Sequence, residues 1–277
     1  MTIREETGSP ETSLIVHLYM RSVVMDFENR VALITGAGSL EGIGMSIARQ
    51  LSKRGATVVL ADINKNGVEA GANEIEGKGG KAYAVQLDVT DQKQMQSVVE
   101  EMVKKVGKID IVVNNAGVSR PSRVQEITES EWDFVLNVNL KGPFFLTQAV
   151  LPYMKENRYG RIVNLSSVSG KRGGGVFGGS HYSAAKAGLT GFTKAVAREV
   201  ASYGITCNTV APGLIGGTDI TGGLMTEEKE QEIKRDIPLG RLGQVEDVSY
   251  AITFLASEGA GYITGEELDI NGGSHID

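Results

Sequence analysis

The chain has 277 residues, with 28 lysines and arginines against 34 aspartates and glutamates, and therefore a formal net charge of −6. This length suits one α/β domain with a substantial core, and an acidic balance without a basic stripe argues against a nucleic-acid partner. The single cysteine, Cys207, excludes an intrachain disulfide and a cysteine-rich zinc site, and it fits a reducing, cytoplasmic compartment. The three histidines, His17, His181 and His275, lack metal-ligand spacing, so we expect no metal.

Residues 1–25 differ in character from the rest of the chain, and we expect them to form a disordered or loosely docked extension. Glu5 and Glu6 stand where a signal peptide carries positive charge, and the apolar stretch 14–24 is short and interrupted by His17 and Arg21. The stretch therefore predicts neither a signal peptide nor a membrane span. A targeting helix, a docking segment and an upstream start codon are the alternatives. Residues 26–277 are expected to form one domain.

Short β-rich runs alternate with longer amphipathic or polar segments beyond this extension. We predict strands at residues 31–35, 57–61, 82–87, 109–113, 161–165, 206–210 and 267–270, with mostly helical segments between them. This alternation is typical of a parallel sheet wrapped by helices. Residues 170–180 and 213–223 are rich in glycine and are predicted to be loops that form mobile walls of a ligand site, or else ordinary surface connections.

The first predicted strand ends in a glycine-rich turn over residues 36–44, and a helical pattern through Ile47, Ala48 and Leu51 comes next. Glycines let the backbone approach a pyrophosphate closely, and the helix offers its N-terminal amides to the negative charge. The second strand ends at Asp62, about twenty residues further on, where a carboxylate can accept hydrogen bonds from ribose hydroxyls. A glycine-rich turn alone predicts only a tight connection, but turn and acid together predict a dinucleotide site.

Tyr182 and Lys186 are four residues apart in a stretch that continues to Arg198 without a proline. Residues at i and i+4 share a helical face, so an ammonium group can lie near the phenol and favour its phenolate. A phenol has a pKa near 10, so a base that works near neutrality needs about 4 kcal/mol of nearby positive charge. Lysine and an oxidised nicotinamide ring could supply it. Such a pair often arises by chance, but beside a dinucleotide site it predicts an enzyme.

These motifs resemble those of the short-chain dehydrogenase/reductase family over residues 27–273. After the glycine-rich turn the family's markers appear in its order: Asp88-Val89, Asn114-Asn115-Ala116-Gly117, Asn139-Leu140-Lys141-Gly142, Leu165-Ser166-Ser167, Tyr182 with Lys186, Pro212-Gly213, and Leu268-Asp269-Ile270-Asn271-Gly272-Gly273. The chain looks most like the group that includes 3-oxoacyl-carrier-protein reductases and many sugar, polyol and secondary-alcohol dehydrogenases. The resemblance implies a single-domain, Rossmann-type, doubly wound parallel sheet of about seven strands and, as is usual in the family, a homotetramer.

The resemblance also assigns catalytic roles. Tyr182 would be the acid/base, Lys186 would bind the nicotinamide ribose and lower the pKa of the tyrosine, and Ser167 would hold the reacting oxygen. Asn139 would hold a water that connects Lys186 to solvent, or would simply be a polar residue that bends a helix. Ser166 and Ser169 are alternatives to Ser167 as the residue that holds the reacting oxygen. Ser167 could instead have only a structural role in a turn at the end of the strand.

The cofactor contacts implied in the same way lie along the whole chain. Asn115 has the alternative duty of bracing the central strands, and Thr218 depends on how its loop folds. The expected contacts are Gly36, Ser39, Ile43 and Gly44 at the pyrophosphate, Asp62 at the ribose, Asp88 and Val89 near the adenine, Asn115, Ala116 and Gly117 beneath the ribose, Tyr182 and Lys186, Pro212, Gly213 and Ile215 at the carboxamide, and Thr218. NAD is predicted over NADP because Asp62 would repel a 2′-phosphate and no lysine or arginine lies in the turn or directly after Asp62.

Two spacings depart from the family pattern. The glycine-rich turn and the interval from Ser167 to Tyr182 are each about two residues longer than usual. A longer first loop also occurs in enoyl-carrier-protein reductases, but their tyrosine and lysine lie farther apart than Tyr182 and Lys186. An enoyl reductase is therefore not expected.

Three functions are compatible with these residues, in order of preference. The first is an NAD(H)-dependent oxidoreductase that acts on a small secondary alcohol or its ketone. The second is a 3-oxoacyl-carrier-protein reductase, for which the basic residues Arg120, Arg123, Lys171 and Arg172 could receive an acidic partner or an anionic substrate, unless they are a solvated rim. The third is a nucleotide-sensing or scaffolding protein without activity, against which the intact set of catalytic residues speaks.

Overall fold

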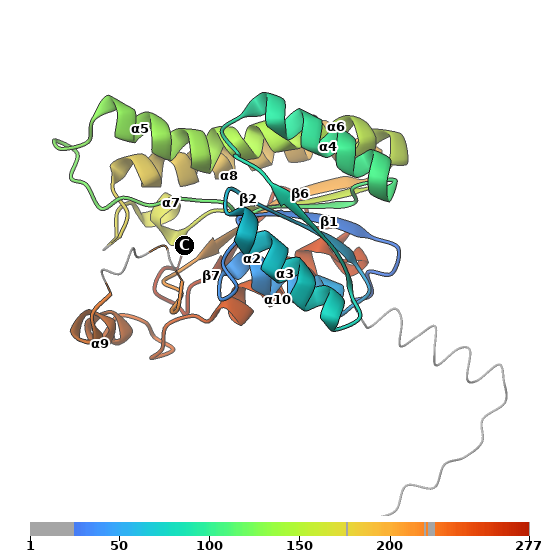
Figure 1. Cartoon of the computed structure of the whole chain (residues 1–277). Helices are drawn as coiled ribbons and strands as arrows, with labels where there is room; N and C mark the ends of the chain where they lie inside the picture. Colours follow the sequence, from blue (N-terminus) through green and yellow to red (C-terminus); the bar gives the residue numbers. More distant parts are fainter. Residues whose placement is uncertain (1–24, 176, 219, 221–224, 277) are drawn as a thin grey trace, which may run out of the picture.

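The computed structural model describes residues 25–175, 177–218, 220 and 225–276. Of the extension predicted for residues 1–25, residues 1–24 therefore lie outside the described residues, whereas Met25 packs against the core. Within these described ranges, the strands form one parallel sheet of seven strands in the order β3-β2-β1-β4-β5-β6-β7 (Figure 1). They are β1 (Val31–Thr35), β2 (Thr57–Asp62), β3 (Lys81–Gln86), β4 (Ile111–Asn114), β5 (Gly160–Leu165), β6 (Ile205–Pro212) and β7 (Glu267–Ile270). This is the predicted doubly wound, Rossmann-type fold.

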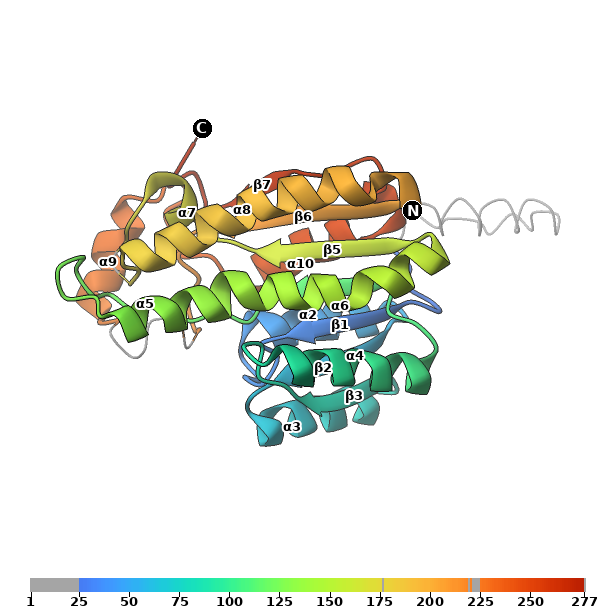
Figure 2. The same ribbon diagram turned by 90° about the horizontal axis from the view of Figure 1, so that it is seen from above.

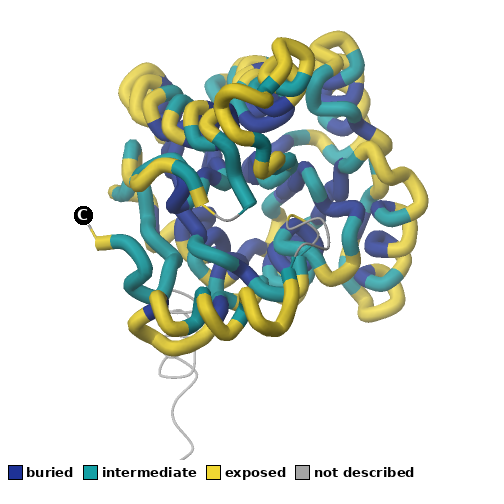
Figure 3. Tube along the Cα trace, turned by 90° about the vertical axis from the view of Figure 1, so that its left-hand side faces the viewer, coloured by how far each residue is buried: buried dark blue, intermediate teal, exposed yellow. Residues whose placement is uncertain are grey.

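Helices cover both faces of the sheet (Figures 1 and 2). One face is covered by α2 (Ile43–Ser52), α3 (Lys65–Gly77) and α10 (Val245–Ala256), and the other by α4 (Gln92–Val106), α6 (Gly142–Asn157) and α8 (Ser180–Val200). The shorter elements are α5 (Glu129–Leu136), the π-helix η1 (Asn137–Lys141), α7 (Val168–Arg172), the 3₁₀ helices η2 (Ala201–Tyr203) and η4 (Glu258–Ala260), and α9 (Glu227–Arg235). Figure 3 shows the buried residues between these layers and the exposed ones on the outer helices.

The strands follow the predicted ones because β-branched and apolar residues fill them. All five residues of β1 and all eight of β6 are buried, as expected of strands covered on both faces. The largest shift in a strand start is in β4, which begins at Ile111 instead of residue 109, after Asp110 has turned its carboxylate to the backbone N–H of Val31. The glycine-rich segment 170–180 is a loop only in part, since α7 extends to Arg172 before the chain becomes irregular.

A cluster of polar side chains closes the end of the sheet where the strands begin. We call it the amino-end cluster, and it consists of Arg30, Lys108, Asp110, Tyr159, Arg161 and Glu258. The buried carboxylate of Asp110 accepts hydrogen bonds from Val31 N–H at 2.9 Å and from Arg30 at 3.2 Å, and lies 3.1 Å from the ammonium of Lys108. The guanidinium carbons of Arg30 and Arg161 lie 3.6 and 4.5 Å from the ring centre of Tyr159. Burial, the largest influence, raises the pKa of Tyr159 to about 12. The cluster therefore bonds largely to itself.

Candidate active site

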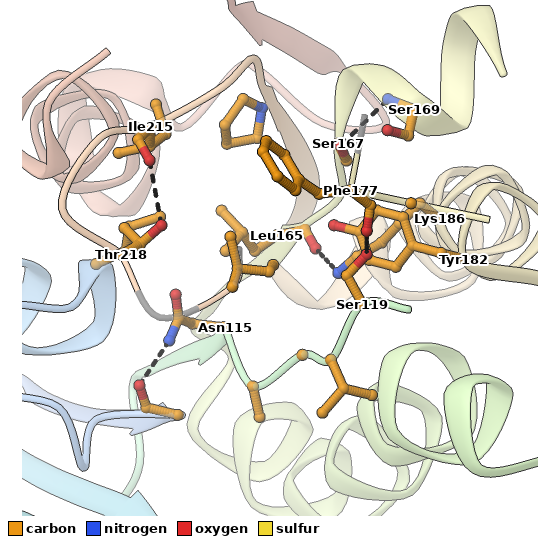
Figure 4. Close-up of a pocket in the computed structure, with 18 of the residues that line it drawn as sticks. Asn115, Ser119, Leu165, Ser167, Ser169, Phe177, Tyr182, Lys186, Ile215 and Thr218 are labelled. Atoms are coloured by element: carbon orange, nitrogen blue, oxygen red, sulfur yellow. Dashed lines mark hydrogen bonds between the residues drawn. The ribbon is translucent and has the colours of Figure 1, made fainter. Parts of the chain in front are cut away.

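A cavity of about 640 Å³ lies where the strands end, between the glycine-rich turn after β1 and the first turn of α8 (Figure 4). This is the position at which open α/β sheets bind ligands. Among the predicted site residues, all except Gly44 and Asn139 line it. These are Gly36, Ser39, Ile43, Asp62, Asp88, Val89, Asn115, Ala116, Gly117, Ser167, Tyr182, Lys186, Pro212, Gly213, Ile215 and Thr218.

The glycine-rich turn is held closely against the start of α2. Gly36 has a φ of +69°, a conformation that glycine adopts without strain. A Cβ on Gly44 would lie 2.4 Å from the carbonyl oxygen of Gly36, so Gly44 allows the helix to pack on the turn rather than lining the cavity. Gly42 and Ile43 do line it, and they place the amino end of α2, with its unpaired N–H groups, at the cavity.

Asp62 is fixed at the opposite side of this turn. Its two carboxylate oxygens each accept a backbone N–H at 2.9 Å, one from Gly38 and one from Asn64. A Cβ on Gly38 would lie only 2.6 Å from the carboxylate carbon, so the turn and the acid fit together closely. Asp62 thereby presents a fixed negative charge to the cavity.

Asn115 braces the central strands, which was the alternative to a direct ligand contact. Its side-chain amide donates to the carbonyl oxygens of Thr35 and Gly36, both at 2.9 Å. The same side chain lines the cavity, so it fixes the glycine-rich turn from the floor of the site.

Ser167, rather than Ser166 or Ser169, lies with Tyr182. The Ser167 hydroxyl acts to lower the pKa of the Tyr182 phenol. It also accepts the backbone N–H of Ser169 at 3.1 Å (Figure 4). Ser166 is buried and donates to the carbonyl oxygen of Lys186 at 3.1 Å, which makes it a strut between β5 and α8. The two residues at the start of α7 therefore have distinct duties.

Lys186 is buried behind Tyr182. Its ammonium donates to the carbonyl oxygen of Leu165 at 2.6 Å and lies 5.6 Å from the centre of the Tyr182 ring. Burial lowers the pKa of Lys186 to about 7. Burial also raises the pKa of Tyr182 to about 12, although Ser167 acts in the opposite direction. Contrary to our expectation from the sequence, the protein's own groups do not lower the pKa of the phenol, because desolvation outweighs them.

Asn139 lies in the π-helix η1 and is fully buried. Its amide group donates to the carbonyl oxygens of Val118 and Val135, both at 2.8 Å, and its side-chain oxygen accepts the N–H of Val118 at 3.3 Å. Both amide hydrogens are used on the backbone, as expected of a structural polar residue in a distorted helix. The side chain thus ties η1 to the loop beneath the cavity.

The loop after β6 forms the wall opposite Tyr182. The N–H of Gly213 donates to Ile270 at 2.9 Å, which holds the Pro212-Gly213 segment against the end of β7. The Thr218 hydroxyl donates to the carbonyl oxygen of Ile215 at 3.2 Å, so this side chain is bonded within its own loop while it lines the cavity (Figure 4). Of the glycine-rich segment 213–223, residues 219 and 221–223 lie outside the described residues.

The cavity has apolar walls that the sequence analysis did not identify. Phe177 lies in the irregular segment before α8, where its carbonyl accepts a hydrogen bond from Ser119, and Phe134 projects from α5. Ile237 lies just beyond α9 and also lines the site. The only sequence signal was a single phenylalanine among glycines, since no motif marks residues that merely face a cavity.

The four basic residues considered for an anionic partner are not equivalent. Lys171 is paired with Asp269 at 2.7 Å. Arg172 lines the cavity and donates to the carbonyl oxygen of Ser274 at 3.3 Å. Arg120 and Arg123 are exposed, and the guanidinium of Arg120 lies 5.7 Å from the Phe134 ring centre. Arg172 is therefore the one of the four that reaches the cavity.

Comparison with known proteins agrees with this geometry. Residues 36–275 match the family described as enoyl-(acyl carrier protein) reductase. The chain is 45% identical over 249 residues to the 3-oxoacyl-[acyl-carrier-protein] reductase FabG of Thermotoga maritima, covering 90% of this chain and 99% of that protein. Identity to the Escherichia coli protein of the same name is 43% over 252 residues, or 91% and 100% of the two chains. An uncharacterized short-chain type dehydrogenase/reductase of Sinorhizobium fredii is 40% identical over 253 residues, which cover 91% of this chain and 100% of that protein.

The chain belongs to the short-chain dehydrogenase/reductase family, as its motifs suggested. It is an oxidoreductase that acts on a keto or hydroxyl group with a nicotinamide cofactor.

The described residues were also compared with what a membrane-spanning helix and a metal site require. None of their helices combines the length and the apolar character needed to cross a bilayer. The same residues contain no group of three or more His, Cys, Asp or Glu side chains arranged to hold a metal ion.

Proposed function

We propose that this protein reduces the 3-oxo group of an acyl thioester carried by an acyl-carrier protein. The main support for this proposal is the similarity to 3-oxoacyl-[acyl-carrier-protein] reductases over nine-tenths of the chain, combined with the position of Ser167, Tyr182 and Lys186 around one cavity. The relatives favour this function over the small secondary-alcohol dehydrogenase that we preferred from the sequence.

The protonation state of Tyr182 supports reduction as the working direction. With a pKa near 12, the phenol holds its proton at neutral pH. It can therefore donate that proton when hydride addition turns a ketone oxygen into an alkoxide. Alcohol oxidation would instead require a phenolate, and burial opposes that form here.

The neighbouring residues have complementary duties in this step. Ser167 holds the ketone oxygen by a hydrogen bond and orients it toward the phenol. Lys186 lies behind the phenol and can return a proton to it after each turnover, since its own pKa is near 7. Asn139 keeps η1 and the Val118 loop in place, and because its amide hydrogens are engaged, it would hold a water through an acceptor oxygen of its backbone or side chain.

The cavity suits a nicotinamide dinucleotide. Gly36, Gly38 and Gly44 leave no room for side chains in the turn that would face the pyrophosphate, and α2 presents N–H groups there. Asp62 would hold the adenosine ribose, and Lys186 would hold the nicotinamide ribose. When bound in its reduced form, the cofactor supplies the hydride that the protein's own residues cannot.

NAD(H) is the form of the cofactor that we propose. Asp62 faces the cavity with a carboxylate fixed by two backbone N–H groups. This charge would repel a 2′-phosphate, and its rigid position prevents it from turning away.

The proposed function is tested by nicotinamide fluorescence with a 3-oxoacyl thioester on carrier protein and on pantetheine, beside a panel of secondary alcohols, sugars and simple ketones. We expect the 3-oxoacyl thioesters to give the highest kcat/KM and NADH to exceed NADPH. A simple ketone or sugar as the best substrate would reject the 3-oxoacyl function, whereas turnover of no substrate would favour the sensing protein.

The secondary-alcohol dehydrogenase remains a second candidate because of the charge at the cavity mouth. Asp236, which follows α9, lines the cavity. Its carboxylate would repel an acidic carrier protein and leave a neutral small molecule unaffected. A higher kcat/KM for pantetheine thioesters than for carrier-linked ones would favour a free substrate.

Assembly and location remain predictions of the family resemblance. A cytoplasmic homotetramer is proposed, and the exposed aromatic residues Tyr250 and Phe254 on α10, with Tyr262 beyond it, support burial against another copy. Light scattering is expected to give four times the chain mass at micromolar concentration, and a monomer would reject the proposal.

A further inference from the structure

The first turn of α8 carries Tyr182 but makes few side-chain bonds of its own. Its N-cap, Gly179, has no side-chain cap and is held by a backbone bond to the carbonyl oxygen of Arg120 at 2.7 Å. Apart from Tyr182, two side chains of this turn bond to other described segments. Ser183 accepts the N–H of Gly174 at 2.9 Å, and His181 bonds to α5.

His181 is fully buried and reaches the first turn of α5. Its Nε2 atom lies 3.0 Å from a carboxylate oxygen of Glu131, whereas Nδ1 has no hydrogen-bond partner among the described residues. A ring with its hydrogen on Nε2 fits this network, because it donates to the carboxylate and leaves a lone pair, rather than an N–H group, without a partner.

Glu131 connects three segments. Its pKa is lowered chiefly by a hydrogen bond from Ser122, with further lowering by His181 and by the charge of Arg120, so the side chain is a carboxylate at neutral pH. Its own N–H donates to Thr128, the N-cap of α5. The carboxylate thus joins α5 to the loop before it and to α8.

These three segments are walls of the active-site cavity. Neighbouring positions on a helix point in different directions, so His181 faces α5 while Tyr182 faces the cavity. Phe134, three residues after Glu131, lines the cavity from α5, and Ser119 lines it from the loop. The bonded group therefore sets where the phenol lies relative to the substrate walls.

We propose that His181 and Glu131 are positioning residues that hold Tyr182 in place for proton transfer. This inference rests on the proposed role of Tyr182 as the proton donor. Catalytic groups must be held within about 0.5 Å of their working position, and a displacement of about 1 Å can cost about 100-fold in rate. A single bond from a buried ring next to the donor is well placed to supply that restraint.

The test compares variants that break the bond with variants that keep it. His181→Phe keeps an aromatic ring and removes the donor, and Glu131→Ala removes the acceptor from a side chain that is 26% exposed. Each is expected to lower kcat by about 10-fold, with the KM and the cofactor Kd within about 2-fold. His181→Gln and Glu131→Gln retain an amide donor or acceptor and should restore most of the rate. Glu129→Ala, on the exposed part of the same turn, is the matched control and should match the parent.

Three further measurements separate positioning from general damage. The double variant of His181→Phe and Glu131→Ala should lose no more activity than either single variant, since both remove one bond. The pH profile of kcat should keep the same apparent pKa while kcat is lower at every pH, because Tyr182 still supplies the proton. Hydrogen exchange in residues 178–185 should be faster in both single variants and unchanged in Glu129→Ala.

Several outcomes would overturn the proposal. A parent-like kcat in Glu131→Ala would do so even if His181→Phe failed to fold, and so would additive losses in the double variant. The ratios can be measured on whichever ketone the parent reduces, so failure on 3-oxoacyl thioesters would reject the proposed substrate and leave this test intact. Unchanged exchange at the start of α8 would reject the restraint itself, with or without a substrate.

Discussion

The two ends of the parallel sheet use polar residues in opposite ways. At the amino end, the carboxylate of Asp110 and the guanidinium of Arg161 bond to protein atoms, and the ring centre of Tyr159 lies 3.6 and 4.5 Å from the guanidinium carbons of two arginines. At the carboxyl end, Ser167 and Tyr182 face a cavity. Polar groups that are bonded within the fold should determine stability, whereas those that face the cavity should determine chemistry. Substitutions at the two ends are therefore expected to have separable effects.

The largest expected effect is that of Tyr182→Phe on turnover. The change removes the phenolic oxygen and keeps the ring, so kcat should fall by about 10²–10⁴-fold. Stability should change by only about 1 kcal/mol, the usual worth of one hydrogen bond. Steady-state rates, cofactor fluorescence titration and urea unfolding test this, and near-normal turnover on a good substrate would refute the mechanism.

Asp110→Ala, at the amino end, should lower the stability of the fold and leave kcat nearly unchanged. It leaves Arg30, Lys108 and the N–H of Val31 without their buried acceptor, which is expected to destabilise the fold by about 3–5 kcal/mol. The kcat of the folded protein should remain within about 2-fold of the parent, because no cavity residue is changed. Urea unfolding and rates measured well below the transition decide it. A large loss of kcat in folded protein would mean that the two ends are coupled.

Asp62→Ala should have an intermediate effect, confined to cofactor choice. Removing the fixed carboxylate is expected to narrow the preference for NAD(H) over NADP(H) by about 10-fold, equivalent to about 1.4 kcal/mol. Asp62→Asn is the matched variant, since it removes the charge and keeps a side-chain oxygen for a backbone N–H. The assignment of Asp62 would be wrong if the parent used NADP(H) as well as NAD(H), or if neither variant altered the ratio of kcat/KM.

Lys186→Met tests a gradual effect, a change in how stability depends on pH. Burial lowers the pKa of Lys186 from 10.5 to about 7, so between these values the unfolded chain binds a proton that the folded chain does not. The stability contributed by this group is therefore flat below about pH 7 and rises with pH above it, by at most about 1.4 kcal/mol per unit.

The variant removes that rise. The difference in unfolding free energy between the parent and Lys186→Met, measured without cofactor, should therefore increase in favour of the parent between about pH 7.5 and 9.5. Lys194→Met, at an exposed position of the same helix, supplies the control. Parallel curves for the parent and Lys186→Met would show that burial does not displace the lysine pKa.

The sequence predicted the fold well because it depends on patterns that are local in the chain. Apolar runs gave the strands, and the glycines of the first turn were identified from the close approach that they permit. The residues of the active site were harder to predict from the sequence. Phe134 and Phe177 reach the cavity only through the packing of α5 and of the segment before α8, which no motif records.

The pKa of Tyr182 is a second property of the site that the sequence pattern did not predict. The spacing to Lys186 predicted an electrostatic lowering, which assumed that the lysine is charged and the phenol hydrated. Both side chains are buried, and Lys186 donates to the carbonyl oxygen of Leu165. Desolvation depends on the whole surrounding fold, so a spacing along one helix could not reveal its size.

The π-helix η1 has a consequence for helical phase. It joins α5 and α6 without a break from Glu129 to Asn157, and its wider turn holds one more residue than an α-helical turn would. Because η1 takes up its extra residue within one wider turn, α5 and α6 keep nearly the phase of one continuous α-helix, and deleting that residue would leave their relative rotation almost unchanged. A residue deleted from the last turn of α5 would instead rotate the start of α5 by about 100° relative to α6. Glu131 would then turn away from His181, and Phe134 away from the cavity. The π-turn is thus the place in this long helix where chain length can change without reorienting the wall of the active site that α5 forms.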